Sequence, residues 1–417
     1  MTIISDTLER RAPQQREQAL MAALPGLIAL AQRSAGWSRI LHGVDAAQIK
    51  DRAALAALPV TRKSQLLALQ TQHPPFGGLT TAPPSQLKRL FMSPGPIFDP
   101  EGDRADWWRF ARPMAALGLR RGHILQNCFS YHFTPAAFMV EGAAEKLGCA
   151  VIPAGIGQTE MQVQAMAALR PDAYVGTPSF LKIIVEKALE MGADIGSLQR
   201  ALVSGEALPP SLRQWLQQHG VRQVLQLYAS ADVGCIAYES ETGGQVNPGM
   251  ILDEELILEI VRPGSGDPVP HGEVGEVVLT SFNPDYPLIR FATGDLSAVI
   301  DGQSPCGRSN TRIKGWMGRA DQSTKVRGMF VHAAQVAEIL KRHPQVGRAR
   351  LVVTGAMASD MMTLHCEVGD PQAAGQDAAA IAATVRELTK LRAEVVFSGP
   401  GSLPNDGKVI EDARSYE

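Results

Sequence analysis

The chain has 417 residues, of which 45% are hydrophobic and 20% are charged, a composition typical of folded globular proteins rather than disordered ones. Its 40 Lys and Arg residues face 42 Asp and Glu residues, so the formal net charge is -2. A chain without a basic surplus has no general attraction for a polyanion, and we expect no nucleic-acid partner. The length predicts two or three domains.

The cysteine count and the N-terminal residues bear on the compartment. Five cysteines, an odd number without a CxxC pair, are typical of neither a disulfide framework nor a zinc ribbon. The first residues lack the basic and then apolar pattern of a signal peptide, and the apolar run over 20–31 is interrupted by Pro25 and Gly26 and is too short to span a bilayer. We therefore expect a cytoplasmic protein without a membrane partner.

Apolar spacing predicts helix over 6–41, with a break at Pro25 and Gly26, and a second short amphipathic piece over 51–57. A further helix is expected to start near Thr61, a possible N-cap, and loop-rich sequence follows from His73 as far as Gly102. From 105 to 238 helices and strands alternate. The predicted helices are 105–118, 135–148, 159–169, 178–192 and 209–220, and the predicted strands are 123–129, 149–154, 173–177, 201–205 and 223–228. Strands that are separated by single helices predict a mostly parallel sheet, which binds ligands beyond the carboxyl ends of its strands.

Helical patterns are missing from 255–300, where β-branched runs between turns predict antiparallel strands. Beyond them we expect a small α+β unit that ends in a loop. Its predicted helices are 333–343 and 377–391, and its predicted strands are 348–355, 361–368 and 393–399. The predicted fold is therefore α/β: a large N-terminal domain of mostly parallel sheets flanked by helices with a small antiparallel β subdomain, and a small α+β C-terminal domain.

The order of motifs along the chain resembles the adenylate-forming enzymes and, within them, the phenylacetate-CoA ligase family. The motifs that carry the resemblance are LPVTRKSQL, FTPAAFMVEGAAEKLGCAVIPAG, YASADVG, PLIRFATGD, GRADQSTKVRG and LPNDGK. The resemblance implies a domain 1–318 with the nucleotide and acyl pockets and a mobile domain 319–417. It implies that ATP activates a carboxylic acid, aromatic or medium-sized, to an acyl-adenylate whose acyl group passes to CoA or a carrier thiol. It leaves a homodimer open.

Three charged residues match the family's reacting groups. Lys408 matches the lysine that reaches both the acid and the α-phosphate, and Asp295 matches the acid that accepts hydrogen bonds from both ribose hydroxyls. Arg319 would reach the ribose or a phosphate with its forked donors. Taken alone, these residues are equally typical of a solvated lysine, a turn aspartate and an arginine paired with Asp321.

The resemblance also implies the remaining nucleotide and thiol contacts. Tyr228 would lie near the base, and Asp232 would hold Mg²⁺ in place of the family's longer glutamate, directly after Ala231. The other implied nucleotide contacts are Ser204, Gly205, Glu206, Ala207 and Ser230. In the charged stretch 312–331 the resemblance implies a hinge at Asp321. Rotation about it would present the face of Lys325, Arg327 and Gly328 for thiol transfer.

The acyl pocket is the least specific prediction. Its candidate residues are Phe129, Tyr131, His132 and Phe133. Aromatic residues at the end of a strand are as often plain core. The family's paired glycines are Pro135 and Ala136 here, which changes the floor of the pocket and disfavours phenylacetate as the acid.

The phosphate loop departs most from the family. In RLFMSPGPIFDPEGD, Ser93 and Gly95 remain, but Pro94 and Pro96 supply no N–H group and no lysine follows. The loop instead carries three acids, Asp99, Glu101 and Asp103. This departure favours an alternative: a degenerate family member that binds nucleotide, acyl-adenylate or thioester without ATP-driven ligation.

Two further classes of site are disfavoured. A hydride-transferring enzyme would need a strand that leads into GxGxxG, and none does. Some relatives carry a Cys/His zinc cluster, of which Cys306 alone persists here. One thiolate does not make a four-ligand site, so we predict no structural zinc.

Overall fold

The computed structural model describes residues 7–262, 266–320, 324–355, 359–404 and 409–414. The chain forms two compact units: a first unit of 1–205 and 216–317, and a second unit of 206–215 and 318–417. The predicted boundary at 318 and the predicted mobility of the C-terminal domain remain predictions. Within the described residues, each helix is too short or too polar to cross a lipid bilayer.

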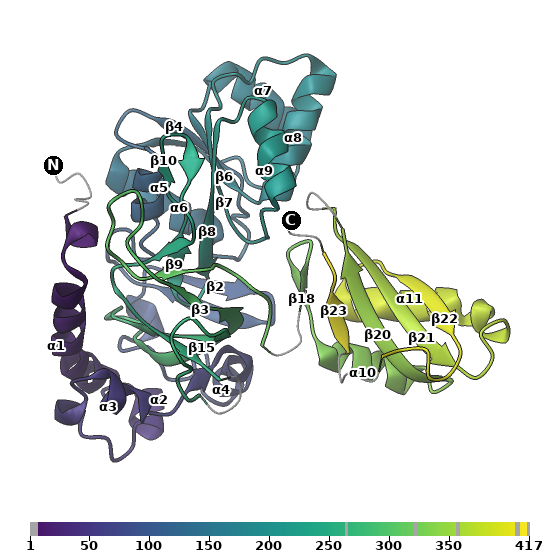
Figure 1. Cartoon of the computed structure of the whole chain (residues 1–417), viewed down its shortest axis with the longest axis horizontal. Helices are drawn as coiled ribbons and strands as arrows, with labels where there is room; N and C mark the ends of the chain where they lie inside the picture. The colour runs from purple at the N-terminus through teal and green to yellow at the C-terminus, as the bar shows by residue number, and fades with distance from the viewer. Residues whose placement is uncertain (1–6, 263–265, 321–323, 356–358, 405–408, 415–417) are drawn as a thin grey trace. The chain divides into compact units, whose positions relative to one another are not determined.

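A nine-stranded sheet is the centre of the first unit (Figure 1). Five strands run parallel to one another, in the spatial order β5 (Ala150–Ile152), β4 (Ile124–Asn127), β6 (Ala173–Gly176), β7 (Arg200–Val203) and β8 (Gln223–Ser230). Antiparallel strands then extend the sheet through β9 (Gly234–Tyr238), β12 (Met250–Leu252), β17 (Arg312–Ile313) and β16 (Val299–Ile300). The predicted α/β class is confirmed.

Helices follow the parallel strands in turn, as the alternating pattern predicts. They are α6 (Ala136–Leu147), α7 (Thr159–Leu169), α8 (Pro178–Met191) and α9 (Pro210–Gln218). Local chemistry sets their ends: the Thr177 side chain accepts a hydrogen bond from the amide of Phe180 at the start of α8, and Gly148 ends α6 with a φ of 74°.

The helix predicted over 105–118 is wrong in extent, since α5 covers only Ala111–Ala116. Asp106 and Arg109 adopt positive φ angles of 51° and 63°, which no helix tolerates. This turn buries Trp107 and Trp108 and lets the Arg109 guanidinium pair with Asp253 at 2.8 Å. Tertiary packing therefore overrides the helical pattern.

The predicted antiparallel strands form a second sheet, in the order β1 (Thr61–Arg62), β15 (Leu288–Ser297), β14 (Gly275–Ser281) and β13 (Leu256–Val261). Strands β15, β14 and β13 are antiparallel to one another, whereas β1 runs parallel to β15. A small hairpin of β10 (Glu241–Thr242) and β11 (Gln245–Val246) follows β9.

The phosphate-loop segment is not a loop but a hairpin of β2 (Arg89–Ser93) and β3 (Ile97–Glu101). Phe91 on β2 is buried, with its ring centroid 5.8 Å from Trp108 and 5.3 Å from Phe138. Because the hairpin has its own apolar anchor, it is part of the core. The prediction of loop-rich sequence through Gly102 is wrong here.

The N-terminal helices begin with α1 (Pro13–Ala31), which continues through Pro25. The predicted break is therefore wrong. Leu24, Leu27 and Ile28 are almost fully buried, and burial of that stripe offsets the one hydrogen bond that a proline removes. Shorter helices follow: α2 (Ala35–Ile40), α3 (Arg52–Ala56) and α4 (Leu66–Gln72).

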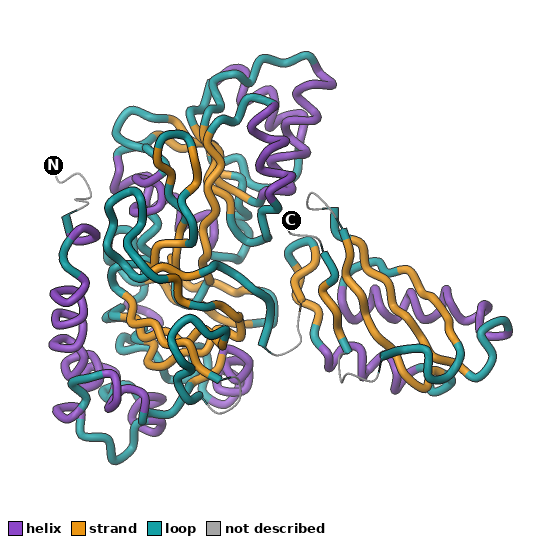
Figure 2. The backbone as a smooth tube through the Cα atoms, in the orientation of Figure 1, coloured by secondary structure: helices purple, strands orange, loops and turns teal. Residues whose placement is uncertain are grey.

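The second unit has a four-stranded sheet in the order β22 (Glu394–Ser398), β21 (Met361–Val368), β20 (Val346–Thr354) and β23 (Ile410–Asp412). Helices α10 (Ala333–Arg342) and α11 (Ala378–Thr389) pack against each other and this sheet (Figure 2). A hairpin of β18 (Thr324–Val326) and β19 (Met329–Val331) precedes them. The chain end, predicted as a loop, contributes β23, which pairs in parallel with β20.

Candidate active site

Pairing of β1 with β15 positions the segment that follows β1. Thr61 of β1 pairs with Phe291 of β15, and Arg62 pairs with Ala292. The next residue, Lys63, therefore follows β1 beside Thr293, within β15. Asp295 lies two residues further along the same strand, so this register delivers an ammonium group to the place where the predicted ribose acid stands.

Lys63 forms an ion pair with Asp232, the predicted magnesium ligand. The Nζ atom of Lys63 lies 2.5 Å from Oδ2 of Asp232, which follows β8 and is 3% exposed. Burial lowers the pKa of Lys63, but the charge of Asp232, its hydrogen bond and the charges of Asp99 and Asp295 together outweigh burial and leave that pKa above its ordinary value. The ammonium is therefore charged at neutral pH.

Asp99 is a second buried carboxylate next to this pair. It is 1% exposed, and Ser93 Oγ donates a hydrogen bond to its Oδ2. Burial, with a further contribution from the charge of Asp232, raises the pKa of Asp99 to about 7, against the lowering effect of Ser93 and Lys63. Ser93, predicted to contact phosphate, here holds an acid.

Three oxygen atoms of this region have no hydrogen-bond partner within the described part of the chain: Oδ1 of Asp99, Oδ1 of Asp232 and the hydroxyl of Tyr286. Tyr286 is 1% exposed, and burial followed by the charges of Asp232 and Asp99 raises its pKa well above the ordinary value. Buried polar atoms normally have partners, so these three mark an incomplete site.

The predicted ribose acid, Asp295, lies on β15 and meets Tyr228 of β8. The Tyr228 hydroxyl donates to Oδ2 of Asp295 at 2.7 Å, and Nε1 of Trp316 donates to Oδ1 at 3.1 Å. Two of the predicted nucleotide residues thus lie in contact. A ribose diol would use the same two carboxylate oxygens, so it would share or displace these donors.

The other predicted nucleotide residues of the first unit stand at strand ends. Ser204 follows β7 and donates its amide to Gly176 O at 3.0 Å, and Gly205 takes the left-handed φ of 85° that favours glycine. Ser230, the last residue of β8, accepts the amide of Val233 at 3.1 Å. Glu206 and Ala207 belong to the second unit.

The predicted thiol-transfer residues lie in the β18–β19 hairpin of the second unit, and Arg319 precedes it. The guanidinium of Arg319 lies 5.4 Å from the ring centroid of Phe330, and Nζ of Lys325 lies 5.6 Å from it, both in the range of cation–π contacts. Arg327 and Gly328 adopt positive φ angles of 47° and 83° at the turn.

Two predicted residues, the hinge Asp321 and the reacting lysine Lys408, lie outside the described residues. Gly95 lies in the turn of the β2–β3 hairpin. Their roles remain predictions.

The four predicted acyl-pocket residues have different surroundings. Phe129 is buried, and the Tyr131 hydroxyl donates to Glu141 at 2.5 Å and accepts from Asn127 at 2.9 Å. His132 is exposed, and Phe133 is 60% exposed. Phe129 and Tyr131 are thus the members of this set that stand in an enclosed environment.

Cys306, the one candidate for a residual zinc ligand, lies 3.1 Å from Ser304 Oγ and 3.5 Å from Nη1 of Arg308. Its neighbours are therefore a hydroxyl and a cation. In the described parts of the chain, no group of three His, Cys, Asp or Glu side chains is arranged to hold a metal ion.

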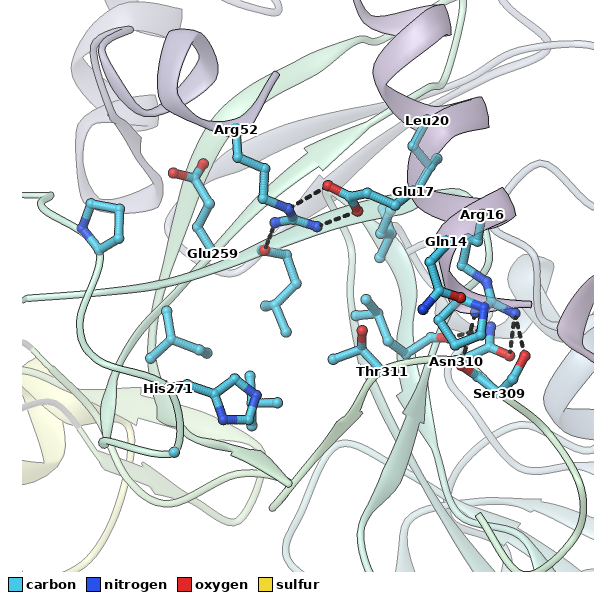
Figure 3. A pocket seen from close by; sticks show the side chains of 18 of the residues that line it. Gln14, Arg16, Glu17, Leu20, Arg52, Glu259, His271, Ser309, Asn310 and Thr311 are labelled. Atoms are coloured by element: carbon cyan, nitrogen blue, oxygen red, sulfur yellow. Dashed lines mark hydrogen bonds and ion pairs between the residues drawn. The ribbon is translucent and has the colours of Figure 1, made fainter. Parts of the chain in front are cut away.

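A separate groove of about 790 Å³ lies between α1 and the sheet strand β13 (Figure 3). Two of its arginines have partners within the lining: Arg52 pairs with Glu17 at 2.7 Å, and Arg16 donates hydrogen bonds to Ser309 and Asn310. None of the predicted site residues lines it. We therefore do not assign the candidate site to this groove. The candidate site is the region around the Lys63–Asp232 pair.

Sequence reasoning missed Lys63 and Tyr286, and it treated Asp99 only as an unfavourable charge. Lys63 stands in LPVTRKSQL, one of the motifs that carry the resemblance, but nothing local separates it from any exposed lysine. The informative signal is the pairing of β1 with β15, which joins segments more than two hundred residues apart along the chain.

Comparison with known proteins supports the predicted resemblance. Residues 114–283 match the family model described as AMP-binding enzyme. The chain is 29% identical over 341 residues to a phenylacetate-coenzyme A ligase of Thermus thermophilus, across 79% of this chain and 75% of that protein. It is 27% identical over 357 residues to that of Aromatoleum evansii, across 83% and 79%. These matches confirm the predicted resemblance to the adenylate-forming, phenylacetate-CoA ligase-like enzymes.

Solved structures agree on the fold. A 2-hydroxyisobutyryl-CoA ligase in complex with 2-HIB-AMP and CoA superposes with a TM-score of 0.83 at 24% identity, over 98% of this chain and 92% of that one. At this identity the superposition establishes the fold alone. The predicted fold class is thereby confirmed.

Proposed function

We propose that this protein is an acid-CoA ligase, which activates a carboxylic acid with ATP to an acyl-adenylate and transfers the acyl group to CoA. The match to the AMP-binding enzyme model and the similarity to phenylacetate-coenzyme A ligases support this function. The single observation that supports it most is the Lys63–Asp232 ion pair near Asp295, whose carboxylate accepts a hydrogen bond from Tyr228. In the proposal, Asp232 binds the metal ion, and Asp295 and Tyr228 contact the ribose.

Lys63 supplies the ammonium group that the phosphate hairpin lacks. A carboxylate that attacks the α-phosphorus brings like charges together, so catalysis depends on positioning and on positive charge at the phosphate oxygens. Pro94 and Pro96 remove two amide donors from the hairpin turn. An ammonium that is 26% exposed can turn from Asp232 towards a triphosphate, at the cost of one ion pair.

Mg²⁺ fits this site, since Asp232 keeps one buried oxygen without a partner. When bound, the ion neutralises phosphate oxygens during transfer. Asp295 and Tyr228 orient the ribose. From the resemblance, Lys408 bridges the acid and the α-phosphate.

The remaining predicted residues concern the acid substrate and the thiol acceptor. Phe129 and Tyr131 favour an aromatic or medium-sized acid. The second unit would turn about Asp321 and present Lys325, Arg327 and Gly328 to CoA or to another carrier thiol. A cytoplasmic location and a homodimer remain part of the proposal.

A second function has a specific observation in its favour. The hairpin carries two prolines and buries Asp99 where relatives bind triphosphate with amides and hydroxyls. A protein that binds nucleotide or acyl-adenylate without ATP-driven ligation would tolerate this arrangement.

Acid-dependent exchange between pyrophosphate and ATP separates the two functions. Across a panel of aromatic and medium-chain acids with pure full-length protein, we expect exchange with at least one acid and CoA-thioester formation from the same acid. Binding of AMP or acyl-AMP without exchange for every acid of the panel would favour the second function.

A further inference from the structure

We propose that Asp99 and Asp232 together form a divalent-cation site that is built before nucleotide binds. The inference rests on the proposed function and deepens it: the resemblance implies one acid for the metal, whereas this chain brings a second. The substitution of a rigid hairpin for the phosphate loop is what places that second carboxylate.

Unpartnered oxygens carry the argument. Asp99 is 1% exposed, and its Oδ1 has no hydrogen-bond partner among the described residues, nor has Oδ1 of Asp232. Each carboxylate already uses its other oxygen, Asp99 with the Ser93 hydroxyl and Asp232 with Lys63. One oxygen of each is therefore held in place and available.

The two carboxylates lie close enough for their charges to interact. The charge of Asp232 acts on Asp99, and the charges of both act on the buried Tyr286 hydroxyl, which also has no hydrogen-bond partner in the described part of the chain. Asp99, Asp232 and Tyr286 therefore bring three oxygen atoms, the ligand type that hard cations prefer, to the same part of the first unit.

The local charge favours a cation. In the part of the chain that the structure describes, Lys63 is the basic residue whose charge acts on Asp99, and it already pairs with Asp232. One positive charge faces two buried carboxylates, and an unpaired buried charge costs several kcal/mol. A divalent ion relieves this imbalance without moving the hairpin.

The number of protein ligands points to magnesium or manganese. Among the described residues no three acidic, histidine or cysteine side chains converge on a metal. Mg²⁺ is typically held by one or two carboxylates and completes its shell with water and substrate phosphates. Two carboxylates and a hydroxyl meet that description.

Mn²⁺ binding tests the site without turnover. The loss of the free Mn²⁺ signal in electron paramagnetic resonance measures binding to the full chain in the absence of ATP, acid and CoA. We expect one Mn²⁺ per chain for the wild type. We expect affinity to be at least about tenfold weaker in Asp99→Asn, because one of two carboxylates is lost.

Glu101→Gln is the matched control. Glu101 lies two residues further along β3, is 4% exposed and pairs with Arg89 at 2.9 Å, so it is a buried acid of the same hairpin with its own partner. We expect its Mn²⁺ affinity to equal that of the wild type.

Three results would overturn the proposal: no stoichiometric Mn²⁺ on the wild type without nucleotide, wild-type affinity in Asp99→Asn, or equal loss in Glu101→Gln. Should Asp99→Asn fail to fold, Ser93→Ala removes the hydrogen bond that orients Asp99. It is expected to weaken binding about tenfold, and wild-type affinity there would also count against the site. The Mn²⁺-binding experiment contains no substrate, so a negative result would not bear on acid-dependent pyrophosphate exchange. Likewise, an absence of exchange would not bear on Mn²⁺ binding.

Discussion

At the scale of single residues, the site depends on a lysine that is remote in sequence from the acids it meets. Lys63 and Asp232 are 169 positions apart. The hairpin segment has no lysine of its own, whereas Lys63 follows β1 directly and brings an ammonium to Asp232. In the proposed function, this ammonium faces the phosphates.

Lys63→Ala should reduce the maximal rate of acid-dependent pyrophosphate exchange by about 100- to 1000-fold, the usual cost of losing a donor that faces developing charge. Initial rates over a range of ATP concentrations check this. Lys88→Ala is the control, because Lys88 is a partly exposed cation beside the same hairpin, 3.7 Å from Glu101. Equal rates in wild type and Lys63→Ala would remove Lys63 from the mechanism.

At the scale of elements, the turn before α5 shows how packing replaces a predicted helix. Asp106 is 4% exposed and accepts the amide of Ala111, and Lys146 lies 3.3 Å from its Oδ2. Burial raises the pKa of Asp106 from 3.8 to about 6, although Lys146 and the Ala111 amide lower it. The turn is thus held by a carboxylate that binds a proton more tightly when folded.

This shift predicts a pH-dependent contribution to stability. Because the folded pKa is raised, the stabilising effect of protonation is fully present below the unfolded value and is lost as pH rises through about 6. Asp106→Asn lacks this titration. The free energy of unfolding of wild type minus that of Asp106→Asn should therefore fall by about 1.4 kcal/mol between about pH 5 and about pH 7.5. Urea unfolding at both values measures it, and a constant difference would contradict the assignment.

At the scale of the whole molecule, the two compact units separate the proposed chemistry. The first unit holds Lys63, Asp232, Asp295 and Tyr228, and the second holds the hairpin with Lys325, Arg327 and Gly328. A division of this kind suits two half-reactions that use different faces of a small domain.

Lys408→Ala should abolish pyrophosphate exchange and leave the thioester step with supplied acyl-adenylate and CoA within a few-fold of wild type, because only adenylation uses that lysine in the proposed cycle. Both half-reactions can be followed by chromatography of the acyl-CoA and nucleotide products. Unchanged circular dichroism would show that folding is intact. Equal loss of both half-reactions would argue against the use of separate faces.

Much of the fold could be predicted because it rests on local patterns. The helix at Thr159–Leu169 coincides with its prediction, since apolar spacing and flanking turns mark both ends. The predictions fail where distant residues decide the conformation. Burial of Trp107 and Trp108 favours a turn where the pattern predicts helix, and burial of Phe91 favours the β2–β3 hairpin where loop is predicted. For the candidate site, motif order predicted Asp232, Asp295 and Tyr228. It did not predict that Lys63 pairs with Asp232 or that Trp316 donates a hydrogen bond to Asp295.

The sequence by itself determined the alternation of strands and helices, the resemblance to adenylate-forming enzymes and the absence of a lysine from the phosphate hairpin. These features depend on neighbouring residues or on the order of motifs. Only the tertiary structure decided that Lys63 meets Asp232 and that Asp99 is buried beside them. The reason is physical: pairing of β1 with β15 and burial of the hairpin set distances between segments far apart in the chain, and no local pattern records those distances.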